Sequence, residues 1–205
     1  MATQSIGKLL FKLSIPAVTA QLINMLYNMV DRMYIGRIPD VGALALTGMG
    51  VCMPVILLIS AFAALVSMGG APRASIKMGE ENHEEAERIL GNCTSTLLAI
   101  SLVLTVVFLT FAEPLLLLFG ASADTIGFAL DYMRIYVMGT VFVQLALGLN
   151  AFITAQGFAV TSMLTVLIGA VLNIVLDPIF IFAFDMGVRA QRLPRSFRRR
   201  FLPYG

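Results

Sequence analysis

Five long runs of apolar side chains constrain this 205-residue chain more than any other feature of its sequence. About 20 such residues cross the roughly 30 Å hydrocarbon core of a bilayer as a helix, and lipid offers no partner to unpaired backbone groups. Only 13% of the residues are charged, whereas a soluble domain carries about a quarter. We therefore predict an all-α membrane protein, a polytopic helical bundle with spans over residues 12–36, 42–68, 92–113, 124–149 and 161–184.

The basic residues near the span ends predict how the bundle sits in a cell membrane. Five of them fall on the side of the N-terminus and of the longest predicted loop, residues 69–91, and two fall on the other side: Lys8, Lys12, Arg73, Lys77 and Arg88 against Arg32 and Arg37. Because cytoplasmic loops carry the excess of lysine and arginine, we expect a multi-pass protein with a cytoplasmic N-terminus. Within the loop, Glu84 and Arg88 have the i,i+4 spacing of a solvated helix.

The last 17 residues do not continue this pattern. Residues 189–205 hold six arginines and no acid, whereas residues 1–188 hold eight basic and twelve acidic residues. The segment has two prolines and no helical apolar period, so we predict a disordered basic tail that is foreign to the fold. Residues 1–188 then form the folded part.

The first span carries a polar stripe. Its members, separated by seven, three, four and three residues, share one helix face: Ser14, Gln21, Asn24, Asn28 and Asp31. The stripe is either hydrogen-bonding glue between helices or the wall of a cavity, and an acid in register with four polar groups favours the cavity. Pro16 either bends this helix or starts it.

A second acid lies in the fifth span. Asn173 and Asp177 are four residues apart, and Pro178 frees the carbonyl of Ile174 from its usual helical bond. Acids at bilayer depth are expensive and typically carry ions or protons. Asp31 and Asp177 each lie in the later part of an outward-running span, at similar predicted depth, so both are candidates for a shared site that binds a proton or a cation. Gln144, four residues after Thr140, is a weaker candidate for lining the cavity, and a structural hydrogen bond explains it equally well.

The remaining polar features carry less information. Cys52 and Cys93 show no metal-ligand spacing and are interpreted as small packing residues. Gly48 and Gly50 in the second span indicate close helix packing or flexibility rather than chemistry.

Four segments in order resemble the multidrug and toxic compound extrusion (MATE) family of exporters, in its bacterial DinF-like and MepA-like branch. They are Phe-Lys-Leu-Ser-Ile-Pro-Ala at 11–17, Met-Val-Asp-Arg-Met-Tyr-Ile-Gly at 29–36, Ser-Ile-Lys-Met-Gly-Glu at 75–80 and Asn-Ile-Val-Leu-Asp-Pro-Ile-Phe-Ile-Phe at 173–182. The resemblance runs to about residue 188 and implies five helices of a six-helix N-lobe. A sixth helix and a C-lobe would be needed to complete the transporter.

The resemblance also implies a function. Members of the family export cationic drugs in exchange for H⁺ or Na⁺, without a further cofactor and without catalysing a reaction. Asp31, Asn173 and Asp177 match the family's N-lobe cation or proton site, and Pro16 matches the proline where its first helix bends. The family pattern breaks at residue 189, so we expect the chain to be a transporter fragment that is inactive alone.

Two other functions fit parts of the pattern. An intramembrane aspartyl protease also needs two acids, but no Gly-x-Gly precedes either acid here. A flippase for lipid-linked oligosaccharides would be expected to carry basic residues in its cavity, and Arg134 is the only such candidate within the five spans. The amides and the acid of the stripe favour small organic cations as cargo.

Overall fold

The computed structural model describes residues 6–38 and 41–178, and these residues form helices without a strand. The helices are α1 (Ile6–Gly36), α2 (Gly42–Gly79), α3 (His83–Thr110), α4 (Ala112–Leu118), α5 (Ile126–Met138), α6 (Thr140–Ala155) and α7 (Ala159–Pro178). Residues 179–184 of the fifth predicted span and the basic tail 189–205 lie outside the described part of the chain.

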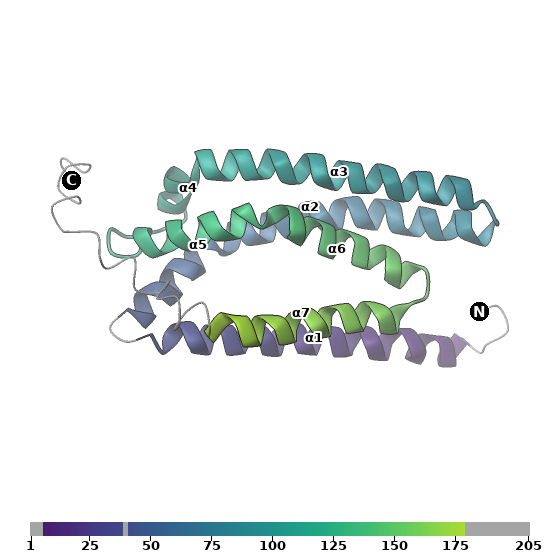
Figure 1. The fold of residues 1–205 in the computed structure, drawn as a ribbon, viewed down its shortest axis with the longest axis horizontal. Helices are drawn as coiled ribbons and strands as arrows, with labels where there is room; N and C mark the ends of the chain where they lie inside the picture. Colours follow the sequence, from purple (N-terminus) through teal and green to yellow (C-terminus); the bar gives the residue numbers. More distant parts are fainter. Residues whose placement is uncertain (1–5, 39–40, 179–205) are drawn as a thin grey trace.

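The long helices run back and forth along one axis (Figure 1). α2 lies at the centre of one group, where it packs against α3, α5 and α6. α1 packs chiefly against α7, and the two run side by side in the same direction (Figure 1). The start of α1 and the α2–α3 turn therefore lie at the same end of the bundle, as the predicted topology requires.

Helix length and composition confirm the membrane class. α2 and α3 are each long and apolar enough to cross a bilayer, and α5 with α6 adds a third span if the bent pair counts as one. The five predicted spans correspond to α1, α2, α3, the α5–α6 pair and α7. The predicted all-α bundle is therefore correct, although fewer helices than five pass the length and hydropathy criterion within the described residues.

The fourth predicted span, residues 124–149, is not one straight helix. It divides at Gly139 into α5 and α6, whose axes differ by 55°. The Gly139 N–H donates to the carbonyls of both Ile135 and Tyr136, at 3.3 and 3.0 Å, which tightens the last turn of α5. Hydropathy carries no sign of such a break because apolar residues continue across it.

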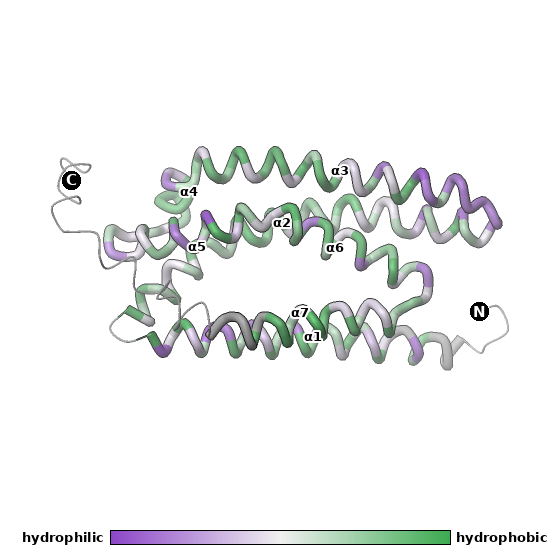
Figure 2. Tube along the Cα trace, in the orientation of Figure 1, coloured by the Kyte–Doolittle hydropathy of each residue, from purple (hydrophilic) through white to green (hydrophobic). Residues whose placement is uncertain are grey.

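The predicted loop 69–91 is wrong in its length, because helix continues from both sides. α2 runs on through Pro72 to Gly79, and α3 begins at His83. Figure 2 shows a stretch of hydrophilic residues at this end of α3. The polar composition of residues 69–91 correctly indicated where the apolar runs end. It did not indicate where the helices end, because a helix can extend into water beyond its apolar part. Arg88 approaches Glu85 at 3.8 Å rather than forming the predicted pair with Glu84.

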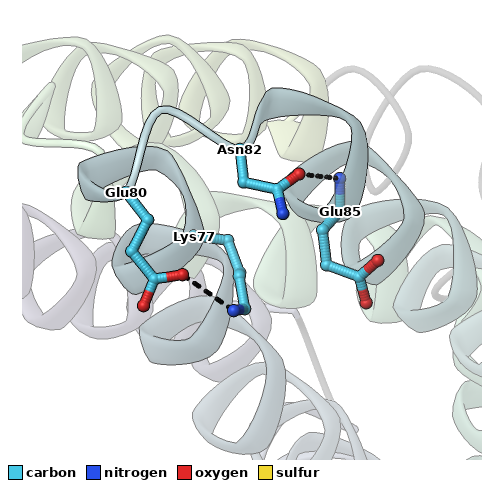
Figure 3. A network of polar contacts seen from close by, with 4 residues as sticks. All are labelled: Lys77, Glu80, Asn82 and Glu85. Carbon is cyan, nitrogen blue, oxygen red and sulfur yellow. Dashed lines mark hydrogen bonds and ion pairs between the residues drawn. The ribbon is translucent and has the colours of Figure 1, made fainter.

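The remaining connection is a short capped turn (Figure 3). Asn82 caps α3, since its Oδ1 accepts from the Glu85 N–H at 3.2 Å. Lys77 closes the end of α2 with an ion pair to Glu80 at 2.8 Å. The hydrogen bond that Lys77 donates to Glu80 raises the pKa of Lys77 above its ordinary value. Glu81, which lies between Glu80 and Asn82 in the turn, adopts a left-handed backbone with φ of 61°.

The core of the bundle lies between α2 and its neighbours. The largest buried cluster joins α2, α3, α4 and α5 and consists of Cys52, Val55, Ile59, Leu104, Phe108, Ala112, Leu116, Ala129, Met133 and Val137. A smaller cluster joins Ala71 and Ala74 of α2 to Phe152 of α6. The thiol of Cys52 donates to the Ala129 carbonyl at 3.3 Å, which agrees with a packing role.

Two glycines of α2 differ sharply in their surroundings. A Cβ on Gly48 would lie 2.9 Å from the backbone nitrogen of Ala129 and 3.1 Å from Cβ of Phe128. A Cβ on Gly50 would meet nothing within 4 Å. The predicted close packing therefore belongs to Gly48, where α2 meets α5.

This difference predicts the stability of two alanine variants. Gly48→Ala forces α2 and α5 apart and should destabilise the bundle by about 1–3 kcal/mol. Gly50→Ala adds its methyl group to open space and should be neutral, or stabilising by up to about 1 kcal/mol through helix propensity. Apparent melting temperatures in detergent measure both, and equal losses in the two variants would contradict the close contact.

Candidate functional site

The predicted polar stripe borders a groove on α1. Gln21, Asn24 and Asn28 line a groove of about 600 Å³ together with Met25, Met29, Arg32 and Met33. Gln21 is exposed, and Asn24 and Asn28 are half-buried. The three predicted cavity-lining amides of the first span therefore come together on one face of the helix.

The groove combines amides with a row of thioethers. Asn28 donates from Nδ2 to the carbonyl of Asn24 at 2.7 Å, one turn earlier, which fixes its orientation. Met25, Met29 and Met33 follow at intervals of four residues, which places them along one side of the helix. Flexible methionine side chains fit ligands of differing shape. The sequence held this signal in the spacing of the methionines by four residues.

Asp31 lies half-buried near the end of α1 and has aromatic neighbours that the sequence analysis missed. Tyr132 of α5 is within electrostatic range of the Asp31 carboxylate. Its ring stacks on that of Tyr136, with centroids 6.2 Å apart, and Tyr27 is within electrostatic range of both tyrosines. The spacing of Tyr132 and Tyr136 by four residues indicates that they share one face of a helix. It does not indicate that α5 approaches α1 near Asp31.

Asn173 and Asp177 are placed by their backbones alone. Both belong to α7, which continues as a helix through Pro178. Because α1 and α7 run in the same direction side by side, the late positions of Asp31 and Asp177 fall at the same end of the helix pair (Figure 1). The side chains of Asn173 and Asp177 lie outside what the structure describes, so their joint site with Asp31 stays a prediction.

Gln144 is inside the helix bundle rather than beside the α1 groove. Its side chain is fully buried, and Nε2 donates to the carbonyl of Ile59 in α2 at 2.9 Å. Among the described residues, the Gln144 Oε1 and the Thr140 hydroxyl are buried without a hydrogen-bond partner. Of the two alternatives for Gln144, cavity lining and a structural hydrogen bond, this contact favours the structural hydrogen bond.

Pro16 lies well inside α1, since the helix begins at Ile6. The alternative that Pro16 merely starts the helix is therefore wrong. Its ring removes one backbone hydrogen bond, to the carbonyl of Lys12 four residues earlier. Ser14, on the same turn, is half-buried.

The fold and the groove define a helical membrane protein with a polar face on α1. The sequence model of the MatE family matches residues 16–179, so the chain belongs to this family. It is 27% identical over 187 residues to the multidrug export protein MepA of Staphylococcus haemolyticus, a match that covers 90% of the chain and 40% of that protein. The MepA of Staphylococcus aureus (strain NCTC 8325) is 26% identical over 184 residues, with 88% and 40% covered.

Solved structures give the same result. The MATE multidrug transporter DinF-BH is 35% identical with a TM-score of 0.82, and the match covers 92% of this chain and 42% of that one. A transporter of the MOP superfamily from Pyrococcus furiosus is 27% identical with a TM-score of 0.80, covering 89% and 40%. The chain thus spans about 40% of the length of the proteins it resembles.

The position of Pro16 predicts a weak point in α1. Pro16→Ala restores a backbone hydrogen bond and should stabilise this part of the helix locally by up to about 3 kcal/mol. Amide hydrogen exchange across residues 12–20 should slow accordingly. Pro54→Ala, in the middle of α2, is the matched control and should leave exchange in α1 unchanged. Unaltered exchange in the Pro16 variant would contradict the weak point.

Proposed function

We propose that this chain supplies five helices of the N-lobe of a multidrug exporter, in which cationic drugs leave the cell in exchange for H⁺ or Na⁺. The observation that carries the proposal is the α1 groove, where amides and methionines face the same space. The family relationship supports it, since MepA is a multidrug export protein. Activity then requires the sixth helix and the C-lobe, and the chain alone is inactive.

The composition of the groove suits drugs of varied shape. Methionine adapts its side chain to different apolar surfaces, and promiscuous binding sites use it for that reason. Gln21, Asn24 and Asn28 offer neutral donors and acceptors without fixing a single ligand geometry. The groove volume of about 600 Å³ is in the range of a drug-sized site.

The coupling ion is assigned to the end of the helix pair α1–α7. In the proposed mechanism, Asp31 receives the ion together with Asn173 and Asp177, with H⁺ binding a carboxylate and Na⁺ its oxygen atoms. Neutralising an acid at this depth removes a large part of its burial penalty. The occupied and empty states therefore favour different packing of α1, and the missing hydrogen bond at Pro16 lets the helix bend between them. We place the N-terminus in the cytoplasm of the cell.

One observation favours the flippase-like alternative. Arg32 lines the groove beside the amides and is the basic residue expected of a site for phosphate-bearing cargo, so Arg134 is not the only basic candidate within the five spans. Asp31 precedes it in the sequence and opposes that charge. Arg32 favours anionic cargo, whereas Asp31 favours cationic cargo. Substituting each residue in turn therefore distinguishes a flippase from a cation exporter.

The test uses a full-length chimera, in which residues 16–179 replace the matching part of the S. haemolyticus exporter MepA. Asp31→Asn should lower efflux of a fluorescent cationic dye from cells at least tenfold, because an amide neither binds a proton nor carries the charge. Asp131→Asn, at an exposed position of α5, is the control and should stay within twofold of the parent.

Arg32→Gln completes the comparison. A cation exporter should retain dye efflux in this variant, whereas a carrier of anionic lipid-linked cargo should lose its transport. Full dye efflux with Asp31→Asn would refute the coupling role of Asp31.

A further inference from the structure

A second groove lies between α2 and α3, away from the polar face of α1. Its volume is about 820 Å³, and its lining includes Val66, Gly69, Arg73, Glu85, Asn92 and Thr96. Gly69 opens it, because a Cβ at that position would meet nothing within 4 Å. Gly70 lies at the bottom of the groove, where the helices are in close contact. A Cβ there would collide with the thiol of Cys93 and lie 2.8 Å from Cζ of Phe152. α2 and α3 are thus in contact at the bottom of the groove and leave open space above it, and this groove is called the slot below.

The slot crosses from apolar to polar surroundings. The apolar run of the second span ends near residue 68, and that of the third begins near residue 92. Val66, Cys93 and Thr96 therefore line the end within the membrane, whereas Arg73 and Glu85 line the end beyond it, together with Ile76 and Ile89. Figure 2 shows the same change along α3. A molecule that fills the slot must be apolar at one end and charged at the other.

The charged end offers one cation and one acid. Lys77 also lines the slot, but its ammonium is bound to Glu80 at 2.8 Å (Figure 3). Within the described part of the chain Arg73 forms no ion pair, whereas Glu85 lies 3.8 Å from Arg88 and within electrostatic range of Lys77. Among the described residues, Arg73 is therefore the cation of the slot without an ion pair, and Glu85 is the acid that no close ion pair holds.

Their order along the helices specifies the ligand further. Arg73 lies seven residues before Glu80, about 10 Å from the turn at 1.5 Å per residue, and Glu85 lies three residues after Asn82, about 4–5 Å from it. Arg73 is thus deeper than Glu85 by about 6 Å. A phospholipid headgroup has its phosphate next to the glycerol, and an ethanolamine ammonium lies further out. The cation of the protein would meet the phosphate, and the acid would meet the ammonium.

The surrounding charge excludes a strongly anionic headgroup. Residues 73–88 hold five glutamates against three basic residues. A headgroup without a positive end would gain the Arg73 contact and face the repulsion of these acids. A choline headgroup offers no N–H to Glu85, whereas an ethanolamine ammonium donates hydrogen bonds.

We propose that this slot binds one phosphatidylethanolamine molecule. The Arg73 guanidinium binds the phosphate, Glu85 accepts from the ammonium, and an acyl chain lies along Val66 and Thr96. Asn92, at the boundary, offers its amide to the phosphate or the ester oxygens. The site does not depend on transport, because it involves neither α1 nor the coupling residues.

The test measures lipid retention by native mass spectrometry on the 205-residue chain purified in detergent. The chain is incubated with equal amounts of phosphatidylethanolamine, phosphatidylcholine and phosphatidylglycerol carrying the same acyl chains. One phosphatidylethanolamine should be retained at least fivefold over either of the others. Equal retention, or a preference for phosphatidylglycerol, would overturn the proposal.

Variants locate the binding. Arg73→Gln and Glu85→Gln should each lower retention of phosphatidylethanolamine at least fivefold. Arg134→Gln, on α5, and Glu84→Gln, an exposed neighbour outside the slot, are the matched controls and should retain it. Glycerophosphoethanolamine, which lacks acyl chains, should not displace the lipid at equal concentration, and displacement would show a headgroup site rather than a lipid site.

A measurement on the unaltered chain covers the case that a variant does not fold. Cys93 lines the slot, whereas Cys52 is buried in the core with 1% of its surface exposed. Phosphatidylethanolamine should slow alkylation of Cys93 by a membrane-soluble maleimide at least fivefold, and phosphatidylcholine should not. An alkylation rate of Cys93 that is the same in both lipids would refute the site.

Discussion

The packing of α2 against three other helices is the interaction on which the rest of the structure depends. At Gly48 the backbone of α2 comes close to α5, and at Gly70 it closes on Cys93 of α3 and Phe152 of α6. Between these points the amide of Gln144 donates across to Ile59. Helices embedded in lipid gain little from burying apolar surface against one another, so small residues and buried hydrogen bonds decide which of them associate. With α2, α3, α5 and α6 held in this way, α1 is free to present polar side chains, and α7 supports it from one side.

The sequence predicted those parts of the fold that follow from the bilayer itself. Apolar runs had to be helices, and their number and alternation gave the order in which the chain crosses the membrane. Features that depend on neighbours were not predictable in this way. Loss of hydropathy after Met68 does not stop a helix that has reached water, so α2 continues to Gly79. The bend at Gly139 arises from the local backbone and leaves hydropathy unchanged.

The residues of the candidate site likewise include some that the sequence could predict and others that depend on neighbouring helices. The stripe from Gln21 to Asn28 follows from helical spacing alone, and the structure gathers these amides at one groove. Gln144 has the same chemistry but faces α2, a difference that no spacing within its own helix could give. The approach of Tyr132 to Asp31 joins residues about a hundred positions apart and needed the fold. The same kind of polar side chain thus lies at a surface groove in α1 and in a buried hydrogen bond in α6, and burial distinguishes the two.

The proposed function requires that the polar face of α1 looks onto water inside the membrane, while its apolar face looks onto lipid. This orientation is measured directly in a cysteine-free version of the full-length chimera with single cysteines along α1. Cysteines in place of Asn24 and Asn28 should react rapidly with a charged, membrane-impermeant thiol reagent, and a cysteine in place of Leu26, which is exposed outside the groove, should not. Equal reaction at the three positions, or reaction at Leu26 alone, would contradict the assignment of this face to the transport path.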